Sequence, residues 1–127
     1  MPPDVRGKFE TLPPETMAAC LALRELAFAA AAEREEIGPL TETLKWGEPS
    51  YLAKTGSTLR IWRTKNDNKP ALFVNCQTSL VERFRDIYPT SFEYRDNRAV
   101  VLTTDVADVE DALRHCMTLT FTYRLWK

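Results

Sequence analysis

A glycine and a proline two residues apart, Gly47 and Pro49, limit what the chain can form around residues 43–51. The segment before them is rich in alanine, a strong helix former, and the segment after them contains runs typical of strands. Pro49 lacks a backbone N–H and disfavours helical geometry in the residue before it, so no helix continues through this point. The sequence therefore predicts a helical N-terminal third, a bend that brings Trp46 and Tyr51 together, and a β-rich middle.

The length and the composition are those of one ordinary globular domain. The chain has 127 residues, of which 44% are hydrophobic and 28% charged. Its net charge of −1 argues against non-specific binding to nucleic acid or to a membrane surface. Residues 54–98 are locally basic, with 9 Lys and Arg against 5 Asp and Glu, which is typical of a solvated sheet face.

The cysteines and the hydropathy predict the compartment. Cys20, Cys76 and Cys116 form no Cys-x-x-Cys pair, and their odd number leaves one over. No apolar run approaches the roughly 18 residues that a membrane span needs. We therefore expect reduced thiols in a cytoplasmic protein without a membrane anchor.

Helical patterns occur in four places. Residues 1–10 contain proline, glycine and charge, and are expected to be a loose lead-in before the domain of residues 11–127. A long helix is predicted from about Glu15 to Glu36, and a short one over Leu40–Lys45 that ends at Gly47. A middle helix is predicted to open at Ser79, and a C-terminal helix at Thr104 or Asp105.

Strand patterns fill most of the remainder. The expected strands are residues 51–54, 58–63, 71–76, 92–95 and 98–103. Thr118–Tyr123 alternates like a strand, and the local pattern leaves helix and strand equally open. The predicted fold is a single α+β domain: an N-terminal helix pair and a small, mostly antiparallel sheet of about five strands, with the middle and C-terminal helices packed on it.

The bend contains the run Trp46-Gly47-Glu48-Pro49-Ser50-Tyr51. This run resembles the Trp-Gly-x-Pro-x-Tyr signature of the YdhG-like family of uncharacterised bacterial domains, and it is the most specific of the matching motifs. The resemblance covers residues 10–125 and implies a compact α+β fold, a helix at residues 118–125, and little about activity. Weaker matches follow in the family's order: Gly56–Arg60, Cys76–Val81, Tyr88-Pro89 and Asn97–Val100.

The same residues suggest a binding site. Arg60 and Trp62 share one face of a predicted strand, and arginine side chains such as Arg60 and Arg98 hold carboxylates and phosphates through paired hydrogen bonds. The alternative is that Trp46 and Tyr51 are core aromatics that only fix the bend. The candidate ligand-binding residues are Trp46, Glu48, Tyr51, Arg60, Trp62 and Arg98.

The prediction is a non-catalytic module for a small anionic ligand or a protein partner. The sheet or the last helix is the expected surface for a homodimer. Some members of the resembled family are labelled frataxin-like iron chaperones, but Glu15, Glu25 and Glu33 spiral around their helix instead of forming a ridge. A Cys-dependent enzyme would need His115 beside Cys76. We predict no catalytic residue, metal ligand, cofactor or nucleic-acid partner.

Overall fold

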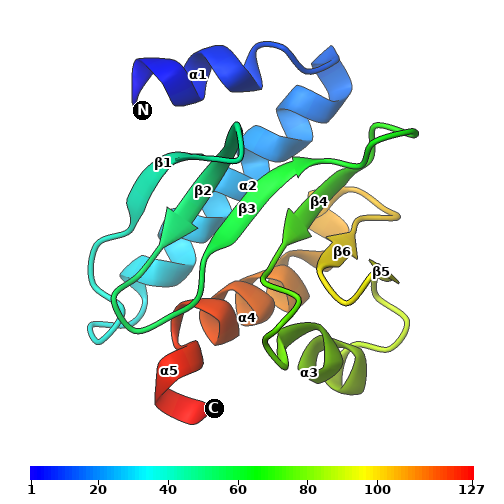
Figure 1. Ribbon diagram of the computed structural model, residues 1–127. Coiled ribbons are helices and arrows are strands. Elements are labelled where there is room, and N and C mark those ends of the chain that lie inside the picture. Colours follow the sequence, from blue (N-terminus) through cyan, green and yellow to red (C-terminus); the bar gives the residue numbers. More distant parts are fainter.

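The computed structural model describes all residues 1–127, and its centre is a six-stranded sheet in which every pair of neighbours is antiparallel (Figure 1). The strand order is β1-β2-β3-β4-β6-β5. The predicted α+β class is confirmed, with one strand more than expected. The strands are β1 (Thr41–Lys45), β2 (Glu48–Leu52), β3 (Leu59–Arg63), β4 (Pro70–Phe73), β5 (Glu93–Arg95) and β6 (Ala99–Val101).

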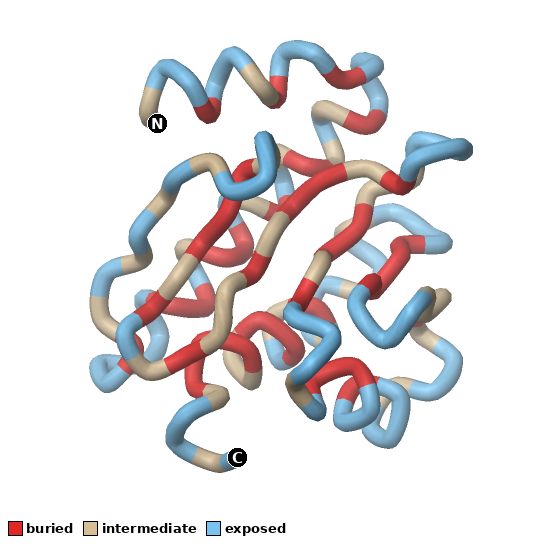
Figure 2. The backbone as a smooth tube through the Cα atoms, viewed as in Figure 1, coloured by how far each residue is buried: buried red, intermediate tan, exposed pale blue.

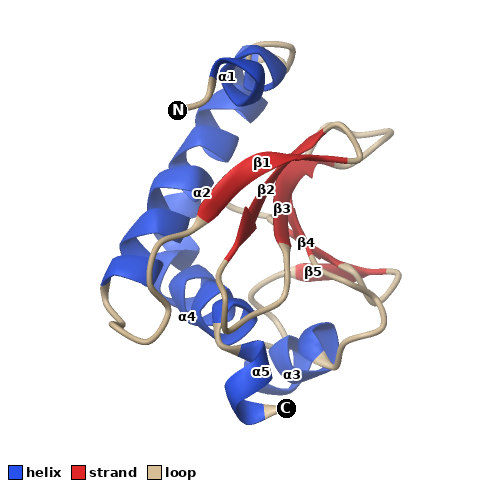
Figure 3. Cartoon of the chain, turned by 60° about the vertical axis from the view of Figure 1, so that its left-hand side comes forward, coloured by secondary structure: helices blue, strands red, loops and turns tan.

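One face of the sheet, called the bare face below, carries no helix except at the end of β3, where Lys8 of α1 lies over Trp62. Helices α2 and α4 pack against each other and against β3, and Figure 3 shows them together on one side of the sheet. None of the helices is both long and apolar enough to cross a membrane. The helical segments are α1 (Pro3–Phe9), α2 (Pro14–Ala32), α3 (Leu80–Ile87), the 3-10 turn η1 (Val106–Val109), α4 (Glu110–Phe121) and α5 (Tyr123–Trp126).

Alternation along the strands builds a core on the helix side and a smaller cluster on the bare side. Leu59 and Ile61 of β3 are fully buried in the main core, which continues through the inner strands and α2 (Figure 2). Between them Arg60 points to the opposite, bare face. There a second apolar cluster forms from Ala71, Ala99 and Val101, with Phe73 packed against it. The bare face is thus apolar at its centre and polar around it.

The predicted helix over Leu40–Lys45 is wrong, because these residues form β1. Trp46 and Gly47 both have positive φ, +56° and +75°, and Lys45 pairs with Glu48 across them. Two residues with φ above zero make the tight hairpin turn whose twist matches the flanking strands. Gly47 is therefore part of the turn that reverses the chain between β1 and β2, and it does not end a helix.

The predicted loose lead-in is also wrong. Pro3–Phe9 is a helix, and its Val5 and Phe9, one turn apart, are buried in the main core. A helix of 7 residues is unstable alone, so this burial against the rest of the chain is what holds it.

The segment that the local pattern left open, residues 118–123, is helical as far as Phe121. Threonine is a poor helix former because its hydroxyl competes for backbone hydrogen bonds. Here each hydroxyl is satisfied within the helix: Thr118, Thr120 and Thr122 donate to the carbonyl oxygens four residues earlier, at 2.7–2.9 Å.

The loop between β2 and β3 caps the C-terminal end of α4. The Ser57 N–H donates to the Thr120 carbonyl at 3.0 Å, and the Thr55 hydroxyl donates to the Phe121 carbonyl at 2.6 Å. These carbonyls are among the last four of the helix, which have no partner within it. Gly56 lies against the same helix end, where a Cβ atom would come within 2.4 Å of the Thr120 oxygen. The loop and the helix end therefore form one unit.

Candidate functional site

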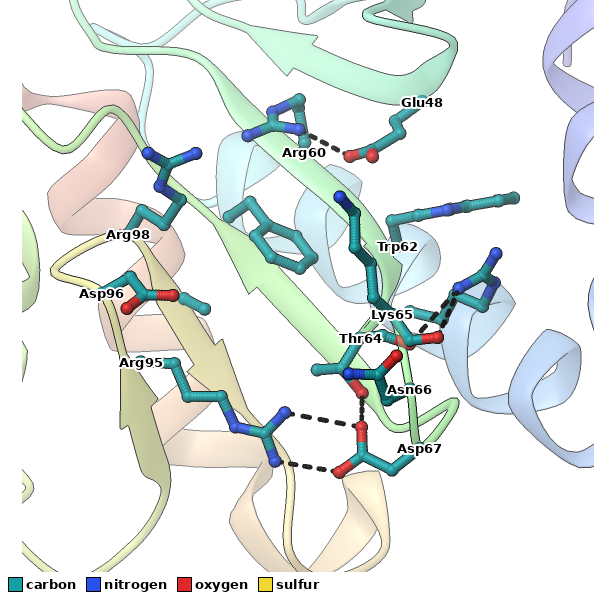
Figure 4. Close-up of a pocket in the computed structure, with 13 residues that line it drawn as sticks. Glu48, Arg60, Trp62, Thr64, Lys65, Asn66, Asp67, Arg95, Asp96 and Arg98 are labelled. Atoms are coloured by element: carbon teal, nitrogen blue, oxygen red, sulfur yellow. Dashed lines mark hydrogen bonds and ion pairs between the residues drawn. The ribbon is translucent and has the colours of Figure 1, made fainter.

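A cleft of about 650 Å³ lies on the bare face of the sheet (Figure 4). It brings together four of the six candidate residues. They are Glu48, Arg60, Trp62 and Arg98. The basic residues Arg63, Lys65 and Arg95 and the acidic Asp67 and Asp96 also line it, so the lining has five basic residues against three acidic ones. The cleft therefore favours an anion over a cation.

Arg60 is fixed from two sides. Its Nη1 donates to Glu48 Oε1 at 2.6 Å, and its guanidinium carbon lies 5.3 Å from the centre of the Phe73 ring. The ion pair and the cation–π contact hold the side chain over the sheet. Its Nε and Nη2 make no hydrogen bond within the chain, so two donor groups are left for a ligand.

Arg98 is the unpaired guanidinium of this cleft. Its side chain makes no hydrogen bond or ion pair within the chain, and in Figure 4 it lies on the same side of the sheet as Arg60. Its backbone is held firmly: Val74 N donates to the Arg98 carbonyl at 2.8 Å. Asp96 and Asn97 before it have φ of +55° and +52°, a geometry that Asp and Asn tolerate well. The turn thus presents a free cation from a fixed backbone position.

On the side of the first cleft away from Arg60, Arg95 forms a network of ion pairs. Arg95 donates to both carboxylate oxygens of Asp67, with Nη2 at 3.0 Å from Oδ2, and also pairs with Glu93 (Figure 4 shows the Asp67 contact). The hydrogen bonds from Arg95 and from Thr64 hold the pKa of Asp67 well below its usual value. The hydrogen bond from Arg95 also lowers the pKa of Glu93. Asp67 and Glu93 are therefore both ionised at neutral pH, and Arg95 is occupied by them.

Trp46 lines a second cleft, of about 630 Å³, which adjoins the first and shares Arg60 and Arg98 with it. Its side chain is 90% exposed. The prediction that Trp46 and Tyr51 pack together at the bend is therefore wrong. The indole stands at the tip of the β1–β2 hairpin, next to Lys45, which lines the same cleft.

Tyr51 belongs to the other side of the sheet. It is 0% exposed, and its hydroxyl donates to Glu42 Oε2 at 2.8 Å. Arg24 of α2 holds the same carboxylate with Nε at 2.6 Å and Nη2 at 3.0 Å. This network ties α2 to the β1–β2 hairpin, so the role of Tyr51 is structural, as the core alternative expected of it.

Trp62 is buried, although it reaches the edge of the first cleft. The Lys8 ammonium lies 5.3 Å from the centre of its ring and covers it from the α1 side. Its ring contributes to the core more than to a ligand-accessible wall.

The structure does not pair the residues that a Cys-dependent enzyme would need. His115 Nδ1 is hydrogen-bonded to the Tyr88 hydroxyl at 2.7 Å, and it makes no hydrogen bond with Cys76, which is exposed in the second cleft. Burial raises the pKa of the Cys20 and Cys116 thiols to about 12. No group of three or more His, Cys, Asp or Glu side chains is arranged to hold a metal ion.

Comparison with protein-family models, curated proteins and solved structures found no match to this chain. The resemblance to the YdhG-like family therefore stays a prediction.

The sequence analysis missed several residues that line the clefts. Phe73 lies in a predicted strand that was apolar on both sides, so nothing marked it as the ring beneath Arg60. Arg95 and Asp67 are far apart in the sequence and meet only because β5 and the β3–β4 turn lie at the same end of the sheet. Lys45 was assigned to a helix.

Replacing Trp46 with asparagine is expected to leave the free energy of unfolding unchanged or to raise it by about 0.5 kcal/mol. The indole is exposed, and asparagine adopts the positive φ of this turn more readily than a bulky residue does. Urea unfolding of both proteins measures the difference. A loss of about 3 kcal/mol, the usual cost of deleting a core aromatic ring, would contradict the exposed position.

Proposed function

We propose that this protein is a non-catalytic binding module that holds a small anionic ligand on the bare face of its sheet, between Arg60 and Arg98. The observation that carries the proposal is the unpaired Arg98 guanidinium, held on a fixed turn beside an Arg60 that keeps two free donor groups. A carboxylate or a phosphate accepts paired hydrogen bonds from such groups.

The surroundings support an anion at this place. Lys65 and Arg98 have no ion-pair partner. Of the three acidic residues that line the cleft, Glu48 and Asp67 are already in ion pairs, and Asp96 is unpaired. Hydrogen bonds to charged groups contribute about 1.5–3 kcal/mol each. The apolar floor formed by Phe73 and Ala99 lowers the local polarity beneath the arginines and strengthens their attraction for a charge.

Arg98→Ala is expected to weaken the binding of inorganic pyrophosphate at least about tenfold, the equivalent of one charge-assisted hydrogen bond. Isothermal titration calorimetry at low ionic strength measures this. The matched control is Arg34→Ala, which removes a cation that lies outside both clefts in an exposed pair with Glu36. Equal affinities for the Arg98→Ala and Arg34→Ala proteins, or no saturable binding by the unmodified protein, would contradict the proposal.

A protein partner, homodimer formation, residence in the cytoplasm and the frataxin-like alternative stay predictions. The mass of the protein in solution, measured by sedimentation, tests the homodimer directly.

A further inference from the structure

We infer that the anionic ligand carries a heteroaromatic ring, as a mononucleotide does: its phosphate is held by Arg60 and Arg98 and its base stacks on Trp46. This inference rests on the proposed function, and it adds the chemical class of the ligand. The observation behind it is that the two clefts meet at the two arginines, with an exposed indole in the second cleft.

The second cleft is of a suitable size and composition. Its volume of about 630 Å³ falls within the roughly 300–1,000 Å³ typical of small-molecule sites. Lys45 and Trp46 come from the β1–β2 hairpin, Arg60 from β3, and Asn75 and Gln77 from the loop after β4. A ligand anchored at the arginines can therefore extend toward the hairpin tip without leaving the surface.

Trp46 is presented in a way that suits stacking. Its backbone is fixed at φ +56° in a tight turn, and β1 pairs with β2 along its whole length up to this turn. A fixed backbone reduces the entropy lost when the ring is covered. Stacking of a base on an aromatic side chain contributes about 1–3 kcal/mol, and burial of the exposed indole contributes further.

The loop after β4 supplies groups that can hydrogen-bond to the edge of a base. Asn75 Oδ1 accepts a hydrogen bond from the Gln77 backbone N–H at 2.8 Å, which leaves the Asn75 amide nitrogen free. The Gln77 side chain makes no hydrogen bond within the chain. Side-chain amides pair with the donor and acceptor groups of bases. An apolar ring without such groups would leave both amides unused.

The test compares AMP with ribose 5-phosphate, which carries the same anion on the same sugar but no base. Calorimetry of the unmodified protein is expected to show AMP bound at least about tenfold more tightly, the lower end of the stacking contribution. Trp46→Asn keeps the turn and removes the ring, so it is expected to abolish this preference while ribose 5-phosphate binds as before. Arg98→Ala is expected to weaken the binding of both AMP and ribose 5-phosphate.

The outcomes separate this inference from the proposed function. Equal affinity for AMP and ribose 5-phosphate, or a preference for AMP that survives Trp46→Asn, would overturn the base-stacking assignment and leave anion binding in place. Failure of AMP, ribose 5-phosphate and pyrophosphate alike to bind would overturn both. Urea unfolding of the Trp46→Asn protein shows whether the variant is still folded. If it is, a lost preference for AMP comes from the missing ring.

Discussion

Arg24→Met is expected to lower the free energy of unfolding by about 3 kcal/mol at neutral pH, the lower end of the range for breaking a buried ion pair. Arg24 and Glu42 have side chains only 15% and 8% exposed, and the guanidinium holds both carboxylate oxygens. Without it, Glu42 keeps only the Tyr51 hydroxyl as a partner for a buried negative charge. Urea or thermal unfolding measures the loss.

Two further variants establish the cause. Glu42→Gln in the Arg24→Met background removes the stranded charge, so the double variant is expected to be more stable than Arg24→Met alone. Arg34→Met removes an arginine from an exposed pair with Glu36 and is expected to cost no more than about 0.5 kcal/mol. A double variant less stable than Arg24→Met would contradict the account.

The pH dependence of stability gives an independent check on this pair. Burial by itself would raise the pKa of Glu42, but the hydrogen bonds from Arg24 and Tyr51 and the Arg24 charge outweigh it, and the pKa is lowered. A carboxyl with a lowered pKa in the folded state stabilises the protein above its unfolded pKa, and this stabilisation is lost as the pH falls through the folded value. The difference between the unmodified protein and Arg24→Met should therefore shrink in acid.

Gly56→Ala is expected to destabilise the protein by about 3 kcal/mol, the upper end of the usual cost of overpacking. The added Cβ would lie 2.4 Å from the Thr120 carbonyl oxygen and 2.5 Å from the Phe121 backbone. Backbone atoms of a helix cannot move aside as a flexible side chain can, so the loop must withdraw. It then loses its hydrogen bonds to α4. Chemical denaturation followed by circular dichroism measures the loss.

Gly7→Ala is the matched control. No atom lies within 4 Å of the position that a Cβ would take, and Gly7 lies inside helix α1. Alanine is the better helix former by about 1 kcal/mol, so this variant should be more stable than the unmodified protein. If both glycine variants lost the same stability, a steric clash at Gly56 would not be the reason.

The sequence could predict the parts of the fold that have a strong local pattern. The long helix α2 and the five strands from β2 to β6 were found near their true positions, because alanine runs and alternating strands mark them directly. The sequence does not predict the strand β1 or the helix α1, and the reason differs between the two. A tryptophan at positive φ is rare, so Trp46 did not look like part of a hairpin turn. Gly7 and the prolines are poor helix formers, so the local sequence does not predict α1. This helix forms because Val5 and Phe9 are buried against the rest of the chain.

The candidate site was predictable in part. Arg60 and Arg98 come from different segments, yet both were proposed as anion donors, and the structure brings them to one cleft. Tyr51 could not be distinguished from them, because the sequence does not reveal that Tyr51 of β2 pairs with Glu42 of β1. The direction of a side chain in a sheet depends on the register of pairing, and a predicted helix at residues 40–45 provides no strand with which Tyr51 could be in register.

The capping of α4 by the loop at residues 55–57 also has a consequence for synthesis on the ribosome. The carbonyl oxygens that anchor the loop belong to Thr120 and Phe121, and Phe121 is synthesised 66 residues after Thr55. The nascent chain therefore cannot complete this anchor until helix α4 has left the exit tunnel. Until then the β2–β3 loop lacks both of its hydrogen bonds to α4.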